Sequence, residues 1–145
     1  INISQKFIIG DGAEFEYTPN LGNKADAYEC GAWLLKDGEN IAKDWDGWVG
    51  VLTNKDPRTA VGIKNNGKTI ILITVDGRQP DYSIGVTAKQ LAQYMENLGV
   101  TDAAMLDGGA STEMIVKGEM VNRPSHKGME RSMAGALIVK ISEGN

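Results

Sequence analysis

The clearest periodic pattern in the chain lies in GVTAKQLAQYMENLG, residues 85–99. Its larger apolar residues recur at spacings of three and four, and they are Leu91, Tyr94, Met95 and Leu98. This spacing places them on one face of a helix. Thr87 and Gln90 have the spacing of a capping box, and Gly99 is suited to end the helix. The pattern predicts an amphipathic helix over residues 88–98.

Shorter apolar runs on either side of this helix predict strands. Three polar turn sequences that contain glycine predict hairpins, and they are Lys36-Asp37-Gly38, Asn65-Asn66-Gly67 and Lys117-Gly118-Glu119. Residues 69–75 (TIILITV) are rich in β-branched side chains and predict a buried central strand. Residues 103–106 and 132–141 (SMAGALIVKI) predict two later strands. The first thirty residues indicate loops that join short strands.

The order of strand 69–75, the helix and strand 103–106 predicts a right-handed crossover between parallel strands. Parallel strands end at the same edge of a sheet, so Asp76 and Asp107, which follow the two strands, should emerge there side by side. The fold class that we predict is α+β, with a mixed, mostly antiparallel sheet and one β-α-β crossover. A single domain is expected over residues 1–145.

The composition fits one globular domain, since the chain has 145 residues, of which 41% are hydrophobic and 23% charged. A formal net charge of -4 argues against sequence-independent binding of nucleic acid. No apolar run approaches the length of a membrane span. The chain has one cysteine, Cys30, and one histidine, His126, so we expect neither a metal site nor a cofactor. Cys30 is interpreted as a small buried residue.

Both Asp76 and Asp107 stand before glycine, in VDGRQP (residues 75–80) and LDGGAST (residues 106–112). Asp-Gly after a strand is ordinary turn chemistry, and this alternative stays open for either turn taken alone. The two turns together indicate a site, because glycines let a ligand approach the backbone and the neighbouring Arg78 suits a phosphate. A dinucleotide-binding loop is disfavoured, since no GxGxxG sequence opens a helix.

Five segments of the chain occur in a recognisable order, and they are PRTAVGI (57–63), VDGR (75–78), GVTAKQLAQYMENLGVTDAAMLDGGAST (85–112), NRPS (122–125) and ERS (130–132). Together they resemble the phosphodiester glycosidase family. The family usually has a third glycine where Ala110 stands, and an upstream Asn-Gly-Gly-aromatic segment that is not evident before Trp33. The chain also begins at Ile1 rather than Met. We therefore expect the carboxyl-terminal part, or a shortened version, of the family domain, with a missing amino-terminal segment or a partner chain completing its pocket.

The resemblance implies hydrolysis of a glycosyl phosphodiester, outside the cell or in its envelope, with no cofactor. The carboxylates it implies near the anomeric carbon are Asp76, Asp107 and Glu130, while Glu113 is a weaker candidate that should face solvent. The implied substrate- and phosphate-binding residues are Arg58, Thr59, Arg78, Gly108, Gly109, Ser111, Thr112, Asn122 and Arg131. Two alternatives stay open: a sugar-phosphate-binding module without turnover, and a structural or assembly domain.

Overall fold

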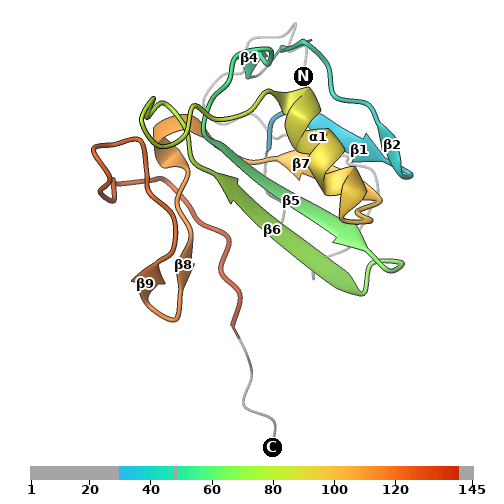
Figure 1. Cartoon of the computed structure of the whole chain (residues 1–145). Coiled ribbons are helices and arrows are strands. Elements are labelled where there is room, and N and C mark those ends of the chain that lie inside the picture. The colour runs from blue at the N-terminus through green and yellow to red at the C-terminus, as the bar shows by residue number, and fades with distance from the viewer. Residues whose placement is uncertain (1–29, 48, 141–145) are drawn as a thin grey trace, which may run out of the picture.

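The structure, a computed structural model, describes residues 30–47 and 49–140. Its strands are β1 (Trp33–Lys36), β2 (Glu39–Asn40), β3 (Trp45–Asp46), β4 (Gly50–Val51), β5 (Arg58–Lys64), β6 (Thr69–Val75), β7 (Asp102–Met105), β8 (Ile115–Val116) and β9 (Glu119–Met120). One α-helix, α1 (Ala88–Asn97), and a short 3-10 helix at Gly109–Ser111 complete the described part of the chain. These elements confirm the α+β class (Figure 1).

Five strands form the main sheet in the order β2-β1-β7-β5-β6, and each of its pairs is antiparallel. Since β6 and β7 both pair with β5, they run in the same direction. They are not neighbours, however, so the expectation that Asp76 and Asp107 emerge side by side is wrong. The registers Arg58↔Val75 and Ala60↔Met105 place the start of β5 and the ends of β6 and β7 at one edge of the sheet. We call this edge the loop end.

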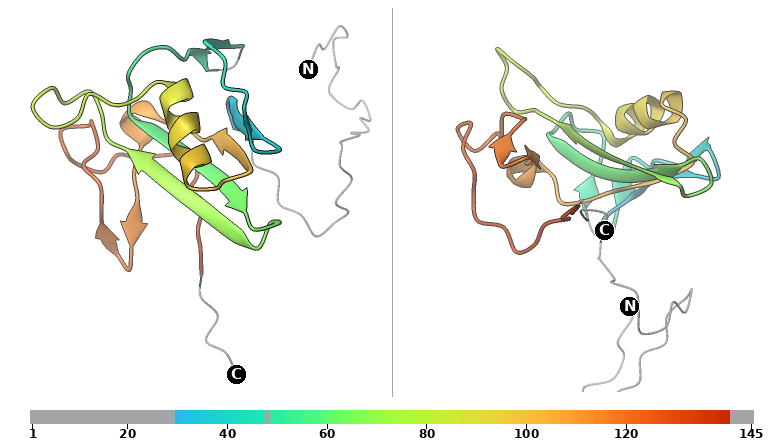
Figure 2. Two further views of the ribbon diagram at one scale, coloured as in Figure 1. Left: turned by 45° about the vertical axis from the view of Figure 1, so that its right-hand side comes forward. Right: turned by 90° about the horizontal axis from the view of Figure 1, so that it is seen from below.

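Helix α1 forms as predicted and carries its capping box. The Gln90 N–H donates to the Thr87 hydroxyl at 3.1 Å, and the Gln90 side-chain oxygen accepts from the Thr87 N–H at 3.0 Å. Leu91 and Met95 lie in its buried face, which covers one face of the sheet (Figure 2). Of the four apolar residues predicted to share one face, Leu91 and Met95 are buried. Tyr94 and Leu98 are 57% and 39% exposed, because they lie at the margin and at the end of that face.

The three predicted hairpins form, as β1–β2, β5–β6 and β8–β9. Their turns include residues with positive φ, such as Asn65 at 56° and Gly118 at 83°. The prediction that β6 is a central strand is wrong. Within the main sheet β6 pairs with β5 alone, so it is an edge strand, and β5 lies between β6 and β7. A further small pair, β3–β4, lies outside the main sheet.

The predicted carboxyl-terminal strand is absent over residues 132–140. This segment runs across the face of the sheet opposite α1, rather than along a strand edge where its backbone would find hydrogen-bonding partners (Figure 2). Its apolar side chains are consequently exposed, with Ile138 at 72% and Val139 at 70%.

Two further expectations concern the start of the chain and its relation to membranes. Cys30 is exposed, so its interpretation as a buried residue is wrong: it precedes β1 and lies outside the core cluster. The strands and loops expected before Cys30 lie outside the described residues. Over residues 30–47 and 49–140, no helix has the length and apolar character to cross a membrane.

Candidate active site

Three loops meet at the loop end of the sheet: the one before β5, the one after β6 and the one after β7. Asp56, before β5, forms a backbone bridge with Val86 in the second loop. Pro57 accepts a hydrogen bond of 2.9 Å from the Gly109 N–H of the third loop. The Asp-Gly turns at Asp76 and Asp107 are therefore both fastened to the start of β5, which lies between them.

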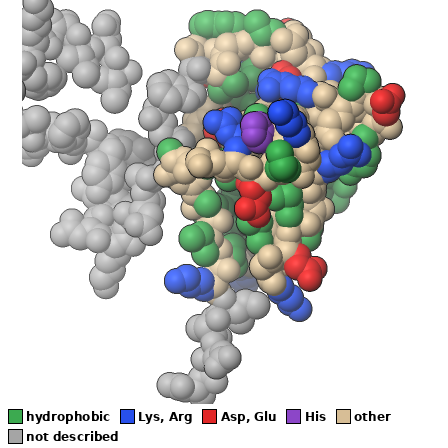
Figure 3. Space-filling model, turned by 90° about the vertical axis from the view of Figure 1, so that its left-hand side faces the viewer, with side chains coloured by type: hydrophobic (Ala, Val, Ile, Leu, Met, Phe, Trp, Pro, Cys, Tyr) green, Lys and Arg blue, Asp and Glu red, His purple; other side chains and the backbone are tan. Residues whose placement is uncertain are grey.

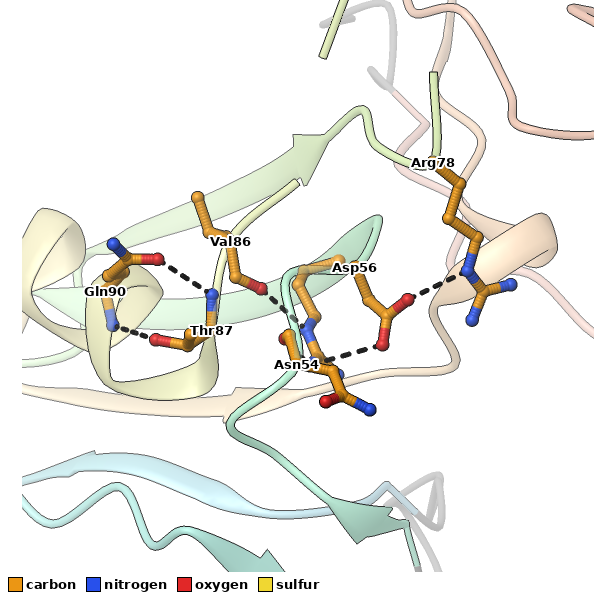
Figure 4. A network of polar contacts seen from close by, with 7 residues as sticks. Asn54, Asp56, Arg78, Val86, Thr87 and Gln90 are labelled. Carbon is orange, nitrogen blue, oxygen red and sulfur yellow. Dashed lines mark hydrogen bonds and ion pairs between the residues drawn. The ribbon is translucent and has the colours of Figure 1, made fainter. Parts of the chain in front are cut away.

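Asp56 holds Arg78 through a salt bridge, as Figure 4 shows: the Arg78 Nε donates to the Asp56 Oδ1 at 2.8 Å. The Arg58 Nη2 lies 3.8 Å from the other carboxylate oxygen. Sequence reasoning missed Asp56, and its position directly before the Pro57-Arg58 pair was the only local signal. Its carboxylate anchors one exposed arginine and one buried arginine at the loop end.

Arg58 is 5% exposed, and its guanidinium donates to the backbone carbonyls of Val86 and Asn54, at 3.2 and 2.9 Å. Burial lowers the pKa of Arg58, Asp56 raises it, and the charge of Arg78 lowers it further. The side chain therefore links the loop before β5 to the start of α1. Arg58, for which the sequence suggested a direct phosphate contact, thus has two of its guanidinium nitrogens engaged by backbone carbonyls.

Asp107 is exposed and stands directly before the glycine turn that opens the 3-10 helix. Gly109 has a φ of +61°, and a Cβ placed on it would lie 3.1 Å from the Arg78 Nη1. The Arg78 guanidinium thus lies directly beside this turn. A Cβ on Gly108 would lie 3.0 Å from the Pro57 carbonyl oxygen, so this residue packs closely on the start of β5.

A hollow of about 700 Å³ opens beside Asp107, with polar groups from Thr59, Ser111 and Glu113 in its wall. The rest of the wall is mostly apolar and comes from β6, residues 114–117 and residues 133–139. Glu113 is half-buried, and its Oε1 accepts a hydrogen bond of 2.9 Å from the Arg131 N–H. Glu113, which was expected to face solvent, thus lines the open hollow while part of its side chain is covered.

Asp76 lines a different hollow, between β6 and α1, together with Tyr82 and Ser83. Its carboxylate accepts hydrogen bonds from Asn122 and from the backbone of Arg123. Thr112 is fully buried, and its hydroxyl lies 3.3 Å from that of Thr59 on β5. Neither Asp76 nor Thr112 is thus presented to the hollow beside Asp107.

Glu130 and Arg131 lie in the exposed segment that follows the NRPS motif. The Arg131 backbone N–H contacts the hollow by donating to Glu113 in its wall. Glu130, which precedes it, is exposed. On the same side of the molecule, Figure 3 shows Lys and Arg side chains gathered around the histidine, above carboxylates. Over residues 30–47 and 49–140, no group of three or more His, Cys, Asp or Glu side chains is placed to hold a metal ion.

The sequence profile of the phosphodiester glycosidase family matches residues 4–140. The chain belongs to the phosphodiester glycosidase family. The match reaches far beyond the segments after Pro57 that carry the resemblance, and includes all the residues described above. The matched range thus covers nearly the whole chain, including the residues before Pro57.

Three relatives show how this phosphodiester glycosidase chain compares with longer proteins. The SPbeta prophage-derived uncharacterized protein YomE of Bacillus subtilis strain 168 is 34% identical over 113 residues, which are 78% of this chain and 17% of that protein. The catalytic domain of zebrafish N-acetylglucosamine-1-phosphodiester α-N-acetylglucosaminidase, auto-inhibited by its pro-peptide, is 29% identical with a TM-score of 0.55, over 64% of this chain and 33% of that one. A hypothetical protein from Synechocystis is 25% identical with a TM-score of 0.52, over 63% of this chain and 17% of that one. The chain therefore spans a third or less of the length of each.

Proposed function

We propose that this chain hydrolyses a sugar-1-phosphodiester, releasing the sugar and leaving a phosphomonoester on the other partner. One observation carries the proposal: in a member of this family, an exposed carboxylate, Asp107, stands on a glycine turn that the Arg78 guanidinium flanks. The two groups come from different loops and have opposite charges. They match a substrate that develops positive charge at a sugar carbon beside a negative phosphate.

In the proposed reaction the bond between the anomeric carbon and the phosphate oxygen breaks, and both electrons leave with that oxygen. Water supplies a hydroxyl group to the anomeric carbon, and its proton is released. The phosphate is already a good leaving group, so the demand for a general acid is modest. Asp107 stabilises the positive charge at the sugar or attacks it directly, and Glu113 in the same hollow is placed to accept a proton from water.

Arg78 is proposed to bind the phosphate. Its Nε is held by Asp56, while its Nη1 faces the turn at Gly109, so the guanidinium is fixed beside the position where the phosphate would lie. The Gly109 N–H already donates to Pro57, so the glycine contributes space rather than a free donor. Ser111 in the hollow completes the proposed substrate contacts. Glu130 and Arg131 lie in the exposed segment whose backbone contacts Glu113.

The experiment compares the wild-type chain with Asp107→Asn on a panel of sugar-1-phosphodiesters, measuring the released sugar and the phosphomonoester together. Asparagine keeps the size and turn propensity of aspartate but removes its charge. We expect kcat to fall by at least about 100-fold, which corresponds to about 2.7 kcal/mol of activation free energy. The free energy of unfolding should change by about 1 kcal/mol or less, because Asp107 is exposed.

Asp81→Asn is the matched control, because Asp81 is also an exposed loop aspartate, beyond the Asp-Gly turn of the neighbouring loop. Its kcat should equal that of the wild-type chain. A folded Asp107→Asn variant with normal turnover would contradict the role of Asp107. A wild-type chain that binds sugar phosphates without hydrolysing any of the panel would contradict the reaction itself and favour a binding module.

A further inference from the structure

The carboxylate of Asp76 is occupied by hydrogen-bond donors of the protein itself. Its Oδ1 accepts from the Asn122 Nδ2 at 2.8 Å, and its Oδ2 accepts from the Arg123 N–H at 2.9 Å and the Tyr82 hydroxyl at 3.2 Å. Both oxygens of this carboxylate are thus engaged by donors of the protein. It is correspondingly less available to attack a substrate.

Asn122 continues this network into the loop that carries Asp107. Its Nδ2 also donates to the Thr112 carbonyl at 2.9 Å, and its Oδ1 accepts from the Met114 N–H at 2.7 Å. The amide therefore has only one orientation that satisfies all its partners, because its nitrogen must face two acceptors and its oxygen a donor. Thr112, which it holds, is fully buried against Thr59.

Arg123 fastens the same network to the loop after β6. Its N–H donates to Asp76, and its carbonyl accepts from the Gln79 Nε2 at 2.8 Å. Its guanidinium lies 5.1 Å from the centre of the Tyr82 ring, whose hydroxyl also reaches Asp76. The half-buried carboxylate of Asp76 thus holds together segments 46 positions apart in the chain, without strand pairing between them.

We infer that Asp76 is a positioning residue which, acting through Asn122, holds the Asp107–Met114 loop in place and does not itself touch the substrate. This inference rests on the proposed function and divides the two Asp-Gly turns by role. Asp107 lines the hollow with Ser111 and Glu113, whereas Asp76 lines the second hollow, between β6 and α1, which shares Met114 and part of β6 with the first. β5 lies between the two strands, so their ends are two strand spacings, or about 10 Å, apart.

The first test is a double-mutant cycle with Asp76→Asn, Asn122→Ala and the double variant, measured as kcat and KM on a sugar-1-phosphodiester. Each single change should lower kcat by about 10- to 100-fold through loss of alignment, with little change in KM. The double variant should be no slower than the slower single variant, because both changes break one link. The low-pH side of the rate profile should keep its midpoint in Asp76→Asn.

Two outcomes of the cycle would overturn the inference. One is that Asp76→Asn lowers kcat by the same factor in the Asn122→Ala variant as in the wild-type chain, since a reacting carboxylate would act independently of Asn122. The other is that the low-pH midpoint shifts or disappears in Asp76→Asn. If Asp76→Asn does not fold, the kcat of Asn122→Ala is the deciding measurement, because this variant breaks the link while leaving Asp76 in place. An unchanged kcat would then refute the positioning role of Asp76.

The second test needs no turnover and therefore separates this inference from the proposed function. Amide hydrogen exchange is measured over residues 107–114 in the wild-type chain, Asp76→Asn, Asn122→Ala and the control Asp81→Asn. We expect faster exchange in that segment in the first two variants, including at the Met114 N–H, and wild-type exchange in the control. Exchange that is unchanged in Asn122→Ala would refute the link, whether or not the chain hydrolyses sugar phosphodiesters.

Discussion

At the scale of single residues, Gly109 leaves little space between its backbone and the Arg78 guanidinium. Gly109 has a φ of +61°, and an added Cβ would lie 3.1 Å from one guanidinium nitrogen and 3.4 Å from the other. We expect Gly109→Ala to displace Arg78 and to raise the inhibition constant of a sugar 1-phosphate by at least about 10-fold, equivalent to about 1.4 kcal/mol. The left-handed backbone should add about 1–2 kcal/mol of destabilisation. Competition assays and chemical denaturation measure the two effects.

Gly118→Ala provides the matched control at the same scale. Gly118 also has a positive φ, +83°, but a Cβ there would meet no atom within 4 Å. It therefore carries the backbone strain without the contact to arginine, so the stability should fall while the inhibition constant stays at the wild-type value. An equal rise of the inhibition constant in both variants would mean that Gly109 acts through general destabilisation and not through Arg78.

At the scale of elements, the packing of α1 on the sheet depends on Gly62 in β5. A Cβ at this position would lie 2.6 Å from a methyl carbon of Val100 and 2.8 Å from the terminal carbon of Met95. Both neighbours are buried, so they have little room to move aside. We expect Gly62→Ala to lower the free energy of unfolding by about 1–3 kcal/mol, measured by chemical denaturation.

Gly47→Ala is the control for this packing prediction. Gly47 has no positive φ, and a Cβ there would make only an ordinary contact of 3.6 Å with the Trp45 ring. Its stability should stay within about 0.5 kcal/mol of the wild-type value. If Gly62→Ala were equally harmless, α1 would have to lie farther from β5 than the structure places it.

At the scale of the whole molecule, the charges at the loop end form separate groups. Asp56 is paired with arginines, Asp76 with donors from the NRPS segment, and Asp107 lies beyond β5 from Asp76. Because no group of three or more His, Cys, Asp or Glu side chains over residues 30–47 and 49–140 is placed to hold a metal ion, we expect catalysis to need no divalent cation. Turnover of a sugar-1-phosphodiester should therefore be unchanged after dialysis against a chelator. Loss of turnover that a divalent ion restores would contradict this expectation.

The sequence by itself determined the features that depend on neighbours a few residues apart. The Thr87–Gln90 capping box, the ends of α1 and the three hairpin turns were predicted because their hydrogen bonds and φ angles are local. The same holds for the Asp-Gly turns at Asp76 and Asp107, each recognisable as a polar turn after an apolar run. The five ordered motifs between Pro57 and Ser132 also sufficed to indicate the family.

Only the tertiary structure decided which of these local features meet. The placement of β5 between β6 and β7, the burial of Arg58 and the unpaired course of residues 132–140 follow from long-range pairing, for which local periodicity carries no signal. The same is true of the link from Asp76 to Asn122, which spans 46 positions. In the sequence, Asp76 and Asp107 have the same local setting, an aspartate between an apolar run and a glycine. Whether its oxygens face solvent or donors of the protein depends on which distant segment packs against it.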